Sequence, residues 1–418
     1  MPEPDRHISE LADHLFRREA GKMVAALTKL FGTGNLQMAE DVVQDTLLLA
    51  FNSWPVKGIP DNPSAWLFRV AKNKAIDCLR HNRHLLHADP EESLPAGPDI
   101  DRLWKPELLQ DDMLRMMFAC CHPKIPDENQ ITLILKTLCG FSTVEIAKAF
   151  LIPEDTVSKR LYRTKEFFRQ EKLRLTIPSG IDLESRTNVV LNAIYLLFNE
   201  GYNSTQSENL LREDLMEDAM MLCRMLTEDK HTQQPEAYAL MALMCFQCSR
   251  NKSRLSPEGE IILLNKQDRT RWNYELINQG NEYMNRAAYG DAVSAYHLEA
   301  AIAFEHCTAS SFDTTNWPQI LNYYNWLYRI TPSAFTAINR TVAIMQVDGP
   351  KAALEALQNI PANNKTDQFY LYHAVLGEIY IRLGDCANAR LSLEKAIQIT
   401  RSAAEKRILR EKIAALLN

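Results

Sequence analysis

The spacing of apolar residues constrains this chain most, because almost every long segment repeats them at the intervals of an α-helix. The pattern predicts a first helix over residues 8–31, ended by Gly32 to Asn35. It predicts a second over 37–54, with the apolar series Val42, Val43, Leu47 and Phe51, and a third over 64–82. A turn is expected from Pro55 to Pro63, with Asn62 and Pro63 as N-cap and first residue of the third helix. No segment shows the alternation of a strand, so we predict an all-α protein.

Length and composition narrow the class of protein. The 418 residues exceed what one core ordinarily organises, which predicts two to four domains. The net charge of -6 excludes a uniformly basic coat but allows a local basic patch. The nine cysteines are odd in number and scattered, the first ten residues are polar, and no apolar run approaches the ~20 residues of a membrane span. We expect a cytoplasmic protein with reduced thiols and no membrane partner.

The helical pattern is interrupted between residues 85 and 112. Residues 83–112 hold eight acidic and three basic side chains, and prolines recur through them. This composition predicts an acidic, extended linker. Helical clusters are expected on its far side over 113–176 and again from residue 183 to the end.

A helix-turn-helix is the sharpest local pattern. Ser142 and Glu145 form a predicted capping box at the start of a short amphipathic helix, 142–150, and Pro153 opens a second helix over 154–173. Residues 156–174 carry seven basic and two acidic side chains, as a DNA recognition helix requires for phosphate contacts. The alternative is a solvated basic helix packed on a neighbour. The side chains expected to face outward are those of Thr156, Ser158, Lys159, Arg160, Arg163 and Lys165.

Two N-terminal motifs carry a family resemblance. The run 39–46 (AEDVVQDT) resembles sigma region 2.2, and the run 65–80 (AWLFRVAKNKAIDCLR) resembles regions 2.3 and 2.4. With the helix-turn-helix as region 4, the order and spacing resemble RNA polymerase sigma factors of the sigma-70 family, extracytoplasmic-function type (group 4). The resemblance implies a region 2 bundle over 7–84, the acidic linker over 85–112 and region 4 over 113–176.

The C-terminal half resembles one subgroup of these factors, in which a TPR-like helical extension follows region 4. The matching runs are 118–123 (FACCHP), 198–202 (FNEGY), 267–272 (QDRTRW) and 296–303, and the best TPR-like unit is 372–400. This resemblance implies an extension over 183–418 whose concave surface takes a protein or peptide partner. A regulatory role and a purely stabilising one both remain open. So does the question of whether the two DNA modules lie apart or packed on the extension.

The resemblance also implies roles for single residues. Asp41, Gln44 and Asp45 would dock on core RNA polymerase, although periodicity alone favours a solvated acidic face. Asn73 would contact a base of the -10 element as single strand, and Arg69 and Arg80 its phosphates. The outward residues of the recognition helix would read the -35 element of promoter DNA. Trp66 is expected in the core, and Asp77 is expected to order a neighbouring arginine.

Other classes of protein fit less well. An operator-binding regulator with a sensory domain, or a TPR scaffold with a helix-turn-helix, would not need the helix implied to dock on core polymerase. It would not need the helix implied to bind the melted -10 strand either. An enzyme is disfavoured, because no phosphate-binding loop, nucleophile elbow or paired-carboxylate motif is found. Cys120, Cys121 and His122 are adjacent and lack the spacing of a structural zinc site, and the pair Cys245 and Cys248 lacks a convincing second pair. We expect no metal and no cofactor.

Overall fold

The structure is a computed structural model, and it describes residues 3–81, 104–150, 152–171, 173, 175–202, 211–257, 259–290, 292–361, 368–400 and 402–416. Within these ranges the elements are helices without a named strand, apart from one isolated bridge between Leu255 and Ile261. The predicted all-α class is confirmed. The chain divides into two compact units, Met1–Gln233 and Gln234–Asn418.

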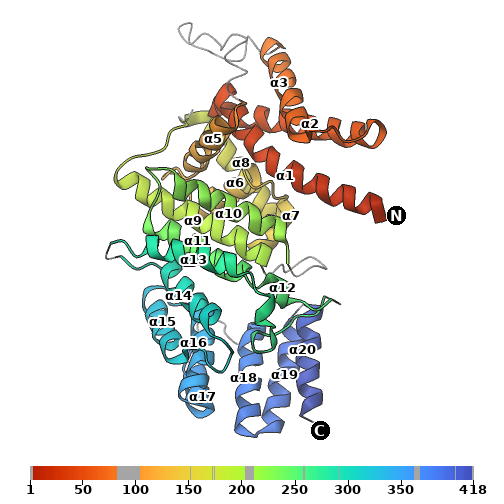
Figure 1. The fold of residues 1–418 in the computed structure, drawn as a ribbon. Coiled ribbons are helices and arrows are strands. Elements are labelled where there is room, and N and C mark those ends of the chain that lie inside the picture. The colour runs from red at the N-terminus through yellow and green to blue at the C-terminus, as the bar shows by residue number, and fades with distance from the viewer. Residues whose placement is uncertain are drawn as a thin grey trace. The chain divides into compact units, whose positions relative to one another are not determined.

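The first unit begins with three helices (Figure 1). These are α1 (Glu3–Phe31), α2 (Leu36–Lys57) and α3 (Pro63–His81), with the short turn η1 (Thr33–Asn35) between the first two. The predicted N-cap of α3 is confirmed, because the Asn62 side chain accepts a hydrogen bond from the Ala65 amide at 3.0 Å. The turn expected from Pro55 begins later, since α2 continues to Lys57 and stops at Gly58, whose φ is 83°. Pro55 lies inside this last turn and has no N–H to donate to the carbonyl four residues earlier, so the turn lacks one backbone hydrogen bond.

Four helices make up the predicted region 4: α5 (Pro106–Cys120), α6 (Asp127–Thr137), α7 (Thr143–Ala149) and α8 (Glu154–Glu171). α5 begins inside the stretch assigned to the linker, with Pro106 in its first turn, where a proline is favoured. The linker residues 85–103 lie outside the described ranges, as does Leu151 of the turn. The capping box of α7 is confirmed by two bonds: Ser142 N–H donates to Glu145 Oε2 at 2.8 Å, and Glu145 N–H donates to Ser142 Oγ at 3.1 Å.

The first two helices of the expected extension belong to the first unit. α9 (Ile181–Tyr202) and α10 (Glu213–Glu228) pack on each other and against α5, and α9 also packs on α6. Figure 1 draws them side by side. The compact unit that holds the sigma-like helices therefore includes the segment up to Gln233.

The second unit is built of successive helices, each packed on its neighbour in the chain or the next but one. They are α11 (Pro235–Cys248), α12 (Asn251–Arg254), α13 (Tyr274–Ala287), α14 (Ala295–Thr308), α15 (Trp317–Ile330), α16 (Ala334–Val347), α17 (Pro350–Gln358), α18 (Tyr370–Leu383), α19 (Cys386–Ile399) and α20 (Ala403–Ala415), with the 3-10 turns η2 (Leu264–Lys266) and η3 (Arg269–Arg271). In the best TPR-like pair, a Cβ added to Gly377 would lie 2.7 Å from the Leu393 side chain. The predicted close approach of paired helices through small residues is confirmed there.

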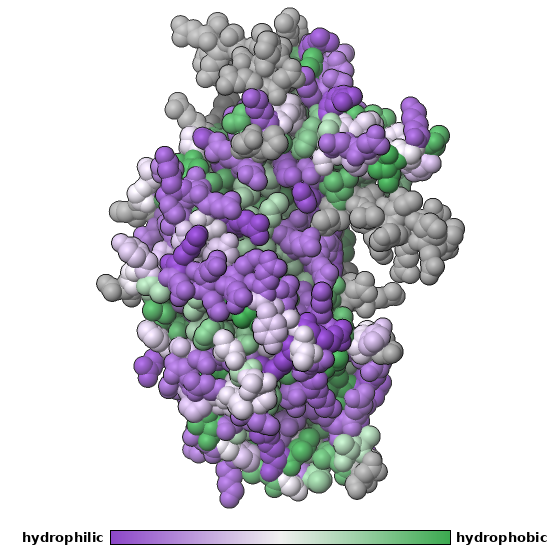
Figure 2. Space-filling model, viewed as in Figure 1, coloured by the Kyte–Doolittle hydropathy of each residue, from purple (hydrophilic) through white to green (hydrophobic). Residues whose placement is uncertain are grey.

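Hydrophilic residues cover most of the face drawn in Figure 2, and apolar residues form scattered patches between them. No described helix is long and apolar enough to cross a membrane.

Candidate nucleic-acid interface

The helix α3 presents one polar side to solvent. Leu67, Ala71, Ala75 and Leu79 are buried and fix the helix on its neighbours. The side chains of Arg69, Asn73 and Arg80 are exposed on the opposite side.

Two further expectations concern Asp77 and Trp66, which lie on the same helix as this polar row. Asp77 forms the expected ion pair with a neighbouring arginine, since Arg80 Nη1 lies 3.6 Å from Asp77 Oδ1. Trp66 is half-buried and packs edge-on against Trp54, with ring centroids 5.6 Å apart. The polar row therefore consists of two arginines and an amide, the groups that suit a single nucleic-acid strand.

On α2, Asp41, Gln44 and Asp45 are also exposed. Gln37 donates to Asp41 Oδ1 at 2.8 Å, and Lys74 Nζ lies 3.3 Å from Asp45 Oδ2. Both contacts are on the surface, where an ion pair contributes little to stability and is readily exchanged for another.

The same helix continues this surface with apolar side chains. Leu48 is 50%, Leu49 44% and Phe51 66% exposed. Phe51 belongs to the apolar series for which the sequence pattern predicts burial, yet it faces solvent. The sequence pattern does not single out Leu48 and Leu49. Their signal in the sequence is a helix with more apolar residues than one buried face can hold. An acidic and apolar surface of this kind is typical of a docking site for another protein.

The recognition helix α8 is anchored by Val157 and Phe168, which are fully buried, and by Leu161. Ser158, Lys159 and Arg163 are exposed, and Thr156 is half-buried. Tyr162, which the sequence did not single out, is 72% exposed between the two bases. A tyrosine beside two basic side chains adds a hydrogen-bonding hydroxyl to this exposed basic face.

Two of the expected DNA-facing residues have acidic partners. Arg160 pairs with Glu128 of α6. Lys165 pairs with Glu40 of α2, and its Nζ also lies 3.0 Å from Gln37 Oε1. In this arrangement the exposed side chains in the first half of α8 are open to solvent, whereas Lys165 is bound to residues of α2.

Direct contact between the two modules extends beyond α8. A Cβ on Gly21 of α1 would lie 2.2 Å from the carbonyl oxygen of Leu138, so the two backbones touch. Thr33 Oγ1 donates to the Leu173 carbonyl at 2.6 Å, and Lys29 Nζ lies 2.6 Å from the buried Asp112 carboxylate. The helix α1 is therefore packed tightly on the predicted region 4.

Four charged residues join three segments of the first unit. Arg17 of α1 and Arg212, directly before α10, both bind Glu145 of α7, at 3.2 and 3.0 Å. The same two arginines bind Asp214 of α10, at 3.6 and 2.9 Å. We call these four residues the ionic cluster. No more than 27% of any of the four side chains is exposed, so solvent screens these pairs less than surface pairs.

The ionisation of Glu145 reflects this setting. Burial alone would raise the pKa of its carboxyl group, but the Ser142 amide, the Arg17 charge and the Arg212 hydrogen bond outweigh burial and lower it to about 2. The carboxylate stays charged at any physiological pH. Glu145 thus caps α7 and holds two arginines from other segments.

Three buried cysteines of the first unit are held as thiols. Burial raises the pKa of the Cys120, Cys121 and Cys139 thiols well above the usual range. Among the described side chains, no three of His, Cys, Asp or Glu lie close enough together to hold a metal ion.

A basic helix-turn-helix and a second helix with a cationic polar row are typical of a DNA-binding protein, and the acidic and apolar surface of α2 is typical of a site that binds a protein partner. Comparison with known proteins gives the family. Residues 15–85 match Sigma-70 region 2, and residues 115–168 match Sigma-70, region 4. Residues 186–288 match a family of unknown function, DUF6596.

Relatives agree with these matches. An uncharacterized protein of Rhizobium meliloti is 32% identical over 380 residues, which are 90% of this chain and 89% of that protein. The ECF RNA polymerase sigma factor SigW of Bacillus subtilis is 27% identical over 144 residues, 33% of this chain and 77% of SigW. SigL of Mycobacterium tuberculosis, also an ECF sigma factor, is 31% identical over 148 residues, 35% of this chain and 77% of SigL. No solved structure matches the chain.

The chain belongs to the sigma-70 family of RNA polymerase sigma factors, in its extracytoplasmic-function group, with a large helical C-terminal extension. Proteins of this family are initiation factors and not enzymes. Core RNA polymerase and promoter DNA are their partners.

Proposed function

We propose that three exposed helix faces divide the work of this sigma factor. The α2 surface around Asp41, Gln44 and Asp45 docks on core polymerase. The α3 row of Arg69, Asn73 and Arg80 takes the -10 element as a single strand. The first half of α8 reads the -35 element. The observation that carries this proposal is that each set presents exposed polar side chains on its own helix, while other residues of the same helix are buried and anchor it.

The docking surface includes the apolar side chains as well as the acids. Carboxylates attract a basic partner and set its orientation, while exposed Leu48 and Phe51 supply apolar area that becomes buried on binding. We therefore add Leu48, Leu49 and Phe51 to the residues proposed for polymerase binding.

Two matched double variants test the division of roles with reconstituted holoenzyme. Lys159→Glu with Arg163→Glu abolishes -35 binding and leaves polymerase binding intact. Asp41→Lys with Gln44→Lys does the reverse. The charge-reversal control, Lys351→Glu with Lys395→Glu on exposed positions of the second unit, changes neither activity. Loss of the same activity in both test variants contradicts the division.

We further propose that the ionic cluster makes the extension a regulator. Arg212 and Asp214 belong to the extension, and they bind residues of both sigma modules at once. The -10 and -35 elements are named for their positions, which lie about 25 base pairs apart, or roughly 85 Å along straight DNA. Modules that touch one another do not reach both elements, so the contacts between α1 and region 4 must open during holoenzyme formation. The extension then sets how readily the protein opens.

Full-length protein with Arg212→Gln and Asp214→Asn tests this regulatory role. The pair Arg390→Gln and Glu394→Gln removes a surface ion pair of 2.8 Å in the second unit and serves as the control. The hydrogen bond from Arg212 to Glu145 joins the extension to region 4, and a charged hydrogen bond contributes about 1.5–3 kcal/mol, so we expect the first variant to bind core polymerase at least about tenfold more tightly than the control. Unchanged or weaker binding means that the cluster stabilises the fold without restraining it.

The second unit offers successive packed helix pairs with exposed aromatic side chains, among them Trp326 and Phe335. We infer that a protein or peptide segment binds there, and that the protein works in the cytoplasm, where core polymerase is found. A chain ended after Gln233 tests the first point. Promoter-dependent transcription by this shorter chain in cells should differ from that of the full chain, whereas identical transcription argues for a merely stabilising unit.

A further inference from the structure

The run 267–272 (QDRTRW) forms a turn at which three segments of the second unit meet. Arg269 begins η3, the buried Trp272 directly follows it, and the Arg269 guanidinium lies over the indole ring, 4.5 Å from its centroid. The Asn273 amide donates to the carbonyl of Ser249, directly after α11, at 2.8 Å. Arg269 Nη1 donates to two carbonyls at the end of α14, at 2.7 Å each. The turn therefore joins the ends of α11 and α14.

The ends of these two helices also touch each other. Cys307 Sγ of α14 donates to the Phe246 carbonyl of α11 at 3.5 Å. His306, the neighbour of Cys307 in the chain, packs edge-on against the half-buried Trp317, with ring centroids 5.3 Å apart. Cationic and aromatic side chains thus gather around the turn. We call the following residues the η3 cluster: Arg250, Arg269, Trp272 and His306.

The η3 cluster is positively charged. Among the described side chains no carboxylate pairs with Arg269. Burial and the charge of Arg250 lower the pKa of the Arg269 guanidinium, and burial and the charges of both arginines lower the pKa of His306 to about 3. The C-terminus of α14 offers Arg269 roughly half a negative charge, which leaves part of the positive charge unbalanced. The cluster therefore favours an anion.

Three nitrogen atoms of the η3 cluster are shielded from solvent and have no hydrogen-bond partner among the described groups. They are Arg269 Nη2, Trp272 Nε1 and His306 Nδ1. The first two are donors only, and the third is a donor in one of the two imidazole tautomers. A shielded N–H without an acceptor is costly, so these groups favour a ligand that supplies acceptor oxygens.

We propose that the η3 cluster binds the carboxylate group of a small organic acid, with Arg269 as the charged donor and His306 as a second donor. The carboxylate supplies both the negative charge and the acceptor oxygens. The rings of Trp317 and Phe312, whose centroids lie 5.1 Å apart beside His306, offer an apolar surface to the carbon skeleton. An inorganic anion leaves that surface unused. Binding gives the extension a chemical signal, and this consequence rests on the regulatory role proposed above.

The test uses the full-length protein with acetate and benzoate as probes. Acetamide and benzamide are the uncharged analogues of the same shape, and chloride is the inorganic anion. Calorimetry measures binding, and NMR of ¹⁵N-labelled histidine at neutral pH reports the tautomer of His306, assigned by its loss in His306→Gln. The other variants are Arg269→Gln and the milder Arg269→Lys, which keeps the charge but loses the forked donor. Arg329→Gln, which changes an exposed arginine of the second unit, is the control.

We expect the two carboxylates to bind and the two amides not to bind. The bound carboxylate holds the His306 ring with its hydrogen on Nδ1. Arg269→Gln weakens binding about tenfold or more, as loss of a charged hydrogen bond does, and Arg269→Lys weakens it less. An unchanged melting temperature of ligand-free Arg269→Lys excludes misfolding as the cause. His306→Gln leaves the Arg269 bonds to the α14 carbonyls in place, so its weaker binding reports the site itself.

Absence of carboxylate binding overturns the proposal. So does an effect of Arg269→Gln and His306→Gln no greater than that of Arg329→Gln. Chloride binding as tight as benzoate binding, with an unchanged His306 tautomer, identifies an adventitious ion only and also overturns it. Promoter-dependent transcription by the same preparation with core polymerase keeps these failures distinct from failure of the sigma function.

Discussion

Gly21 lies at the tightest contact between the two sigma modules. The Cβ of an alanine there would lie 2.2 Å from the Leu138 carbonyl oxygen, more than 1 Å inside an ordinary contact, and the obstacle is backbone. Because Leu138 directly follows α6 and its carbonyl cannot turn aside as a flexible side chain can, we expect Gly21→Ala to push the modules apart. Overpacking of this kind costs about 1–3 kcal/mol, which lowers the ratio of closed to open protein by a factor of about 5 to 150.

The same substitution raises the helix propensity of α1 by about 1 kcal/mol, but this gain is present in the open and the closed protein alike. It therefore cancels in the opening equilibrium. The matched control is Ala20→Gly, which changes helix propensity in the opposite direction and adds no atoms at the contact.

Two measurements decide the outcome for Gly21→Ala. Small-angle scattering should give a larger radius of gyration than for the wild type and Ala20→Gly, and the affinity for core polymerase should rise. An unchanged radius together with unchanged affinity refutes the idea that closed modules restrain holoenzyme formation. A larger radius with unchanged affinity shows that opening is not limiting.

Three further predictions concern other parts of the chain. Burial and the charges of two nearby arginines lower the pKa of His306 to about 3, so the unfolded chain takes up a proton below pH ~6.5 that the folded chain does not. Stability should fall as pH decreases from ~6.5 toward 3, by up to about 1.4 kcal/mol per pH unit, and His306→Gln should flatten this slope in urea denaturation. Gly377→Ala should destabilise the second unit by about 1–3 kcal/mol through its clash with Leu393, and an unchanged melting temperature would show that the α18–α19 pair can separate. Phe51→Ser should weaken polymerase binding about tenfold without lowering the melting temperature, because the ring is 66% exposed, and equal affinity would remove it from the docking surface.

Local structure was predictable from the sequence because its causes are local. The Asn62 cap of α3 and the capping box of α7 join residues three apart, and both hydrogen bonds are present. The same holds for Gly377, where a small residue at a fixed offset predicts the close approach of the next helix.

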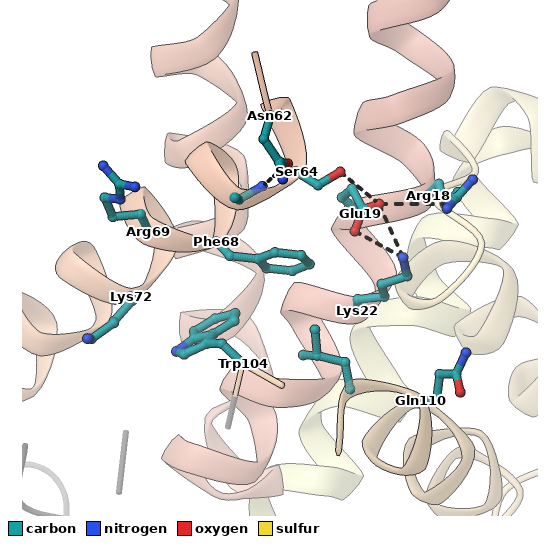
Figure 3. A pocket seen from close by; sticks show the side chains of 12 residues that line it. Arg18, Glu19, Lys22, Asn62, Ser64, Phe68, Arg69, Lys72, Trp104 and Gln110 are labelled. Atoms are coloured by element: carbon teal, nitrogen blue, oxygen red, sulfur yellow. Dashed lines mark hydrogen bonds and ion pairs between the residues drawn. The ribbon is translucent and has the colours of Figure 1, made fainter. Parts of the chain in front are cut away.

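The contacts between modules were not predictable in this way. Glu145 was recognisable as a cap, but its arginine partners are 128 and 67 residues away, and nothing local to Arg17 or Arg212 indicates them. The cavity lined by Lys22 of α1, Phe68 of α3 and Leu109 of α5 (Figure 3) likewise depends on three segments meeting. Phe51 faces solvent because apolar periodicity assigns a residue to a helix face but does not say whether a neighbour covers that face.

The central claim is that this chain makes bacterial core RNA polymerase promoter-specific. Its most direct test is transcription from fragmented genomic DNA by core polymerase with and without the purified full-length protein, with the start sites mapped by sequencing. With the protein present, we expect new transcripts that begin at shared positions downstream of a common pair of sequence elements. No stable complex with core polymerase and no start site that depends on the protein would contradict it.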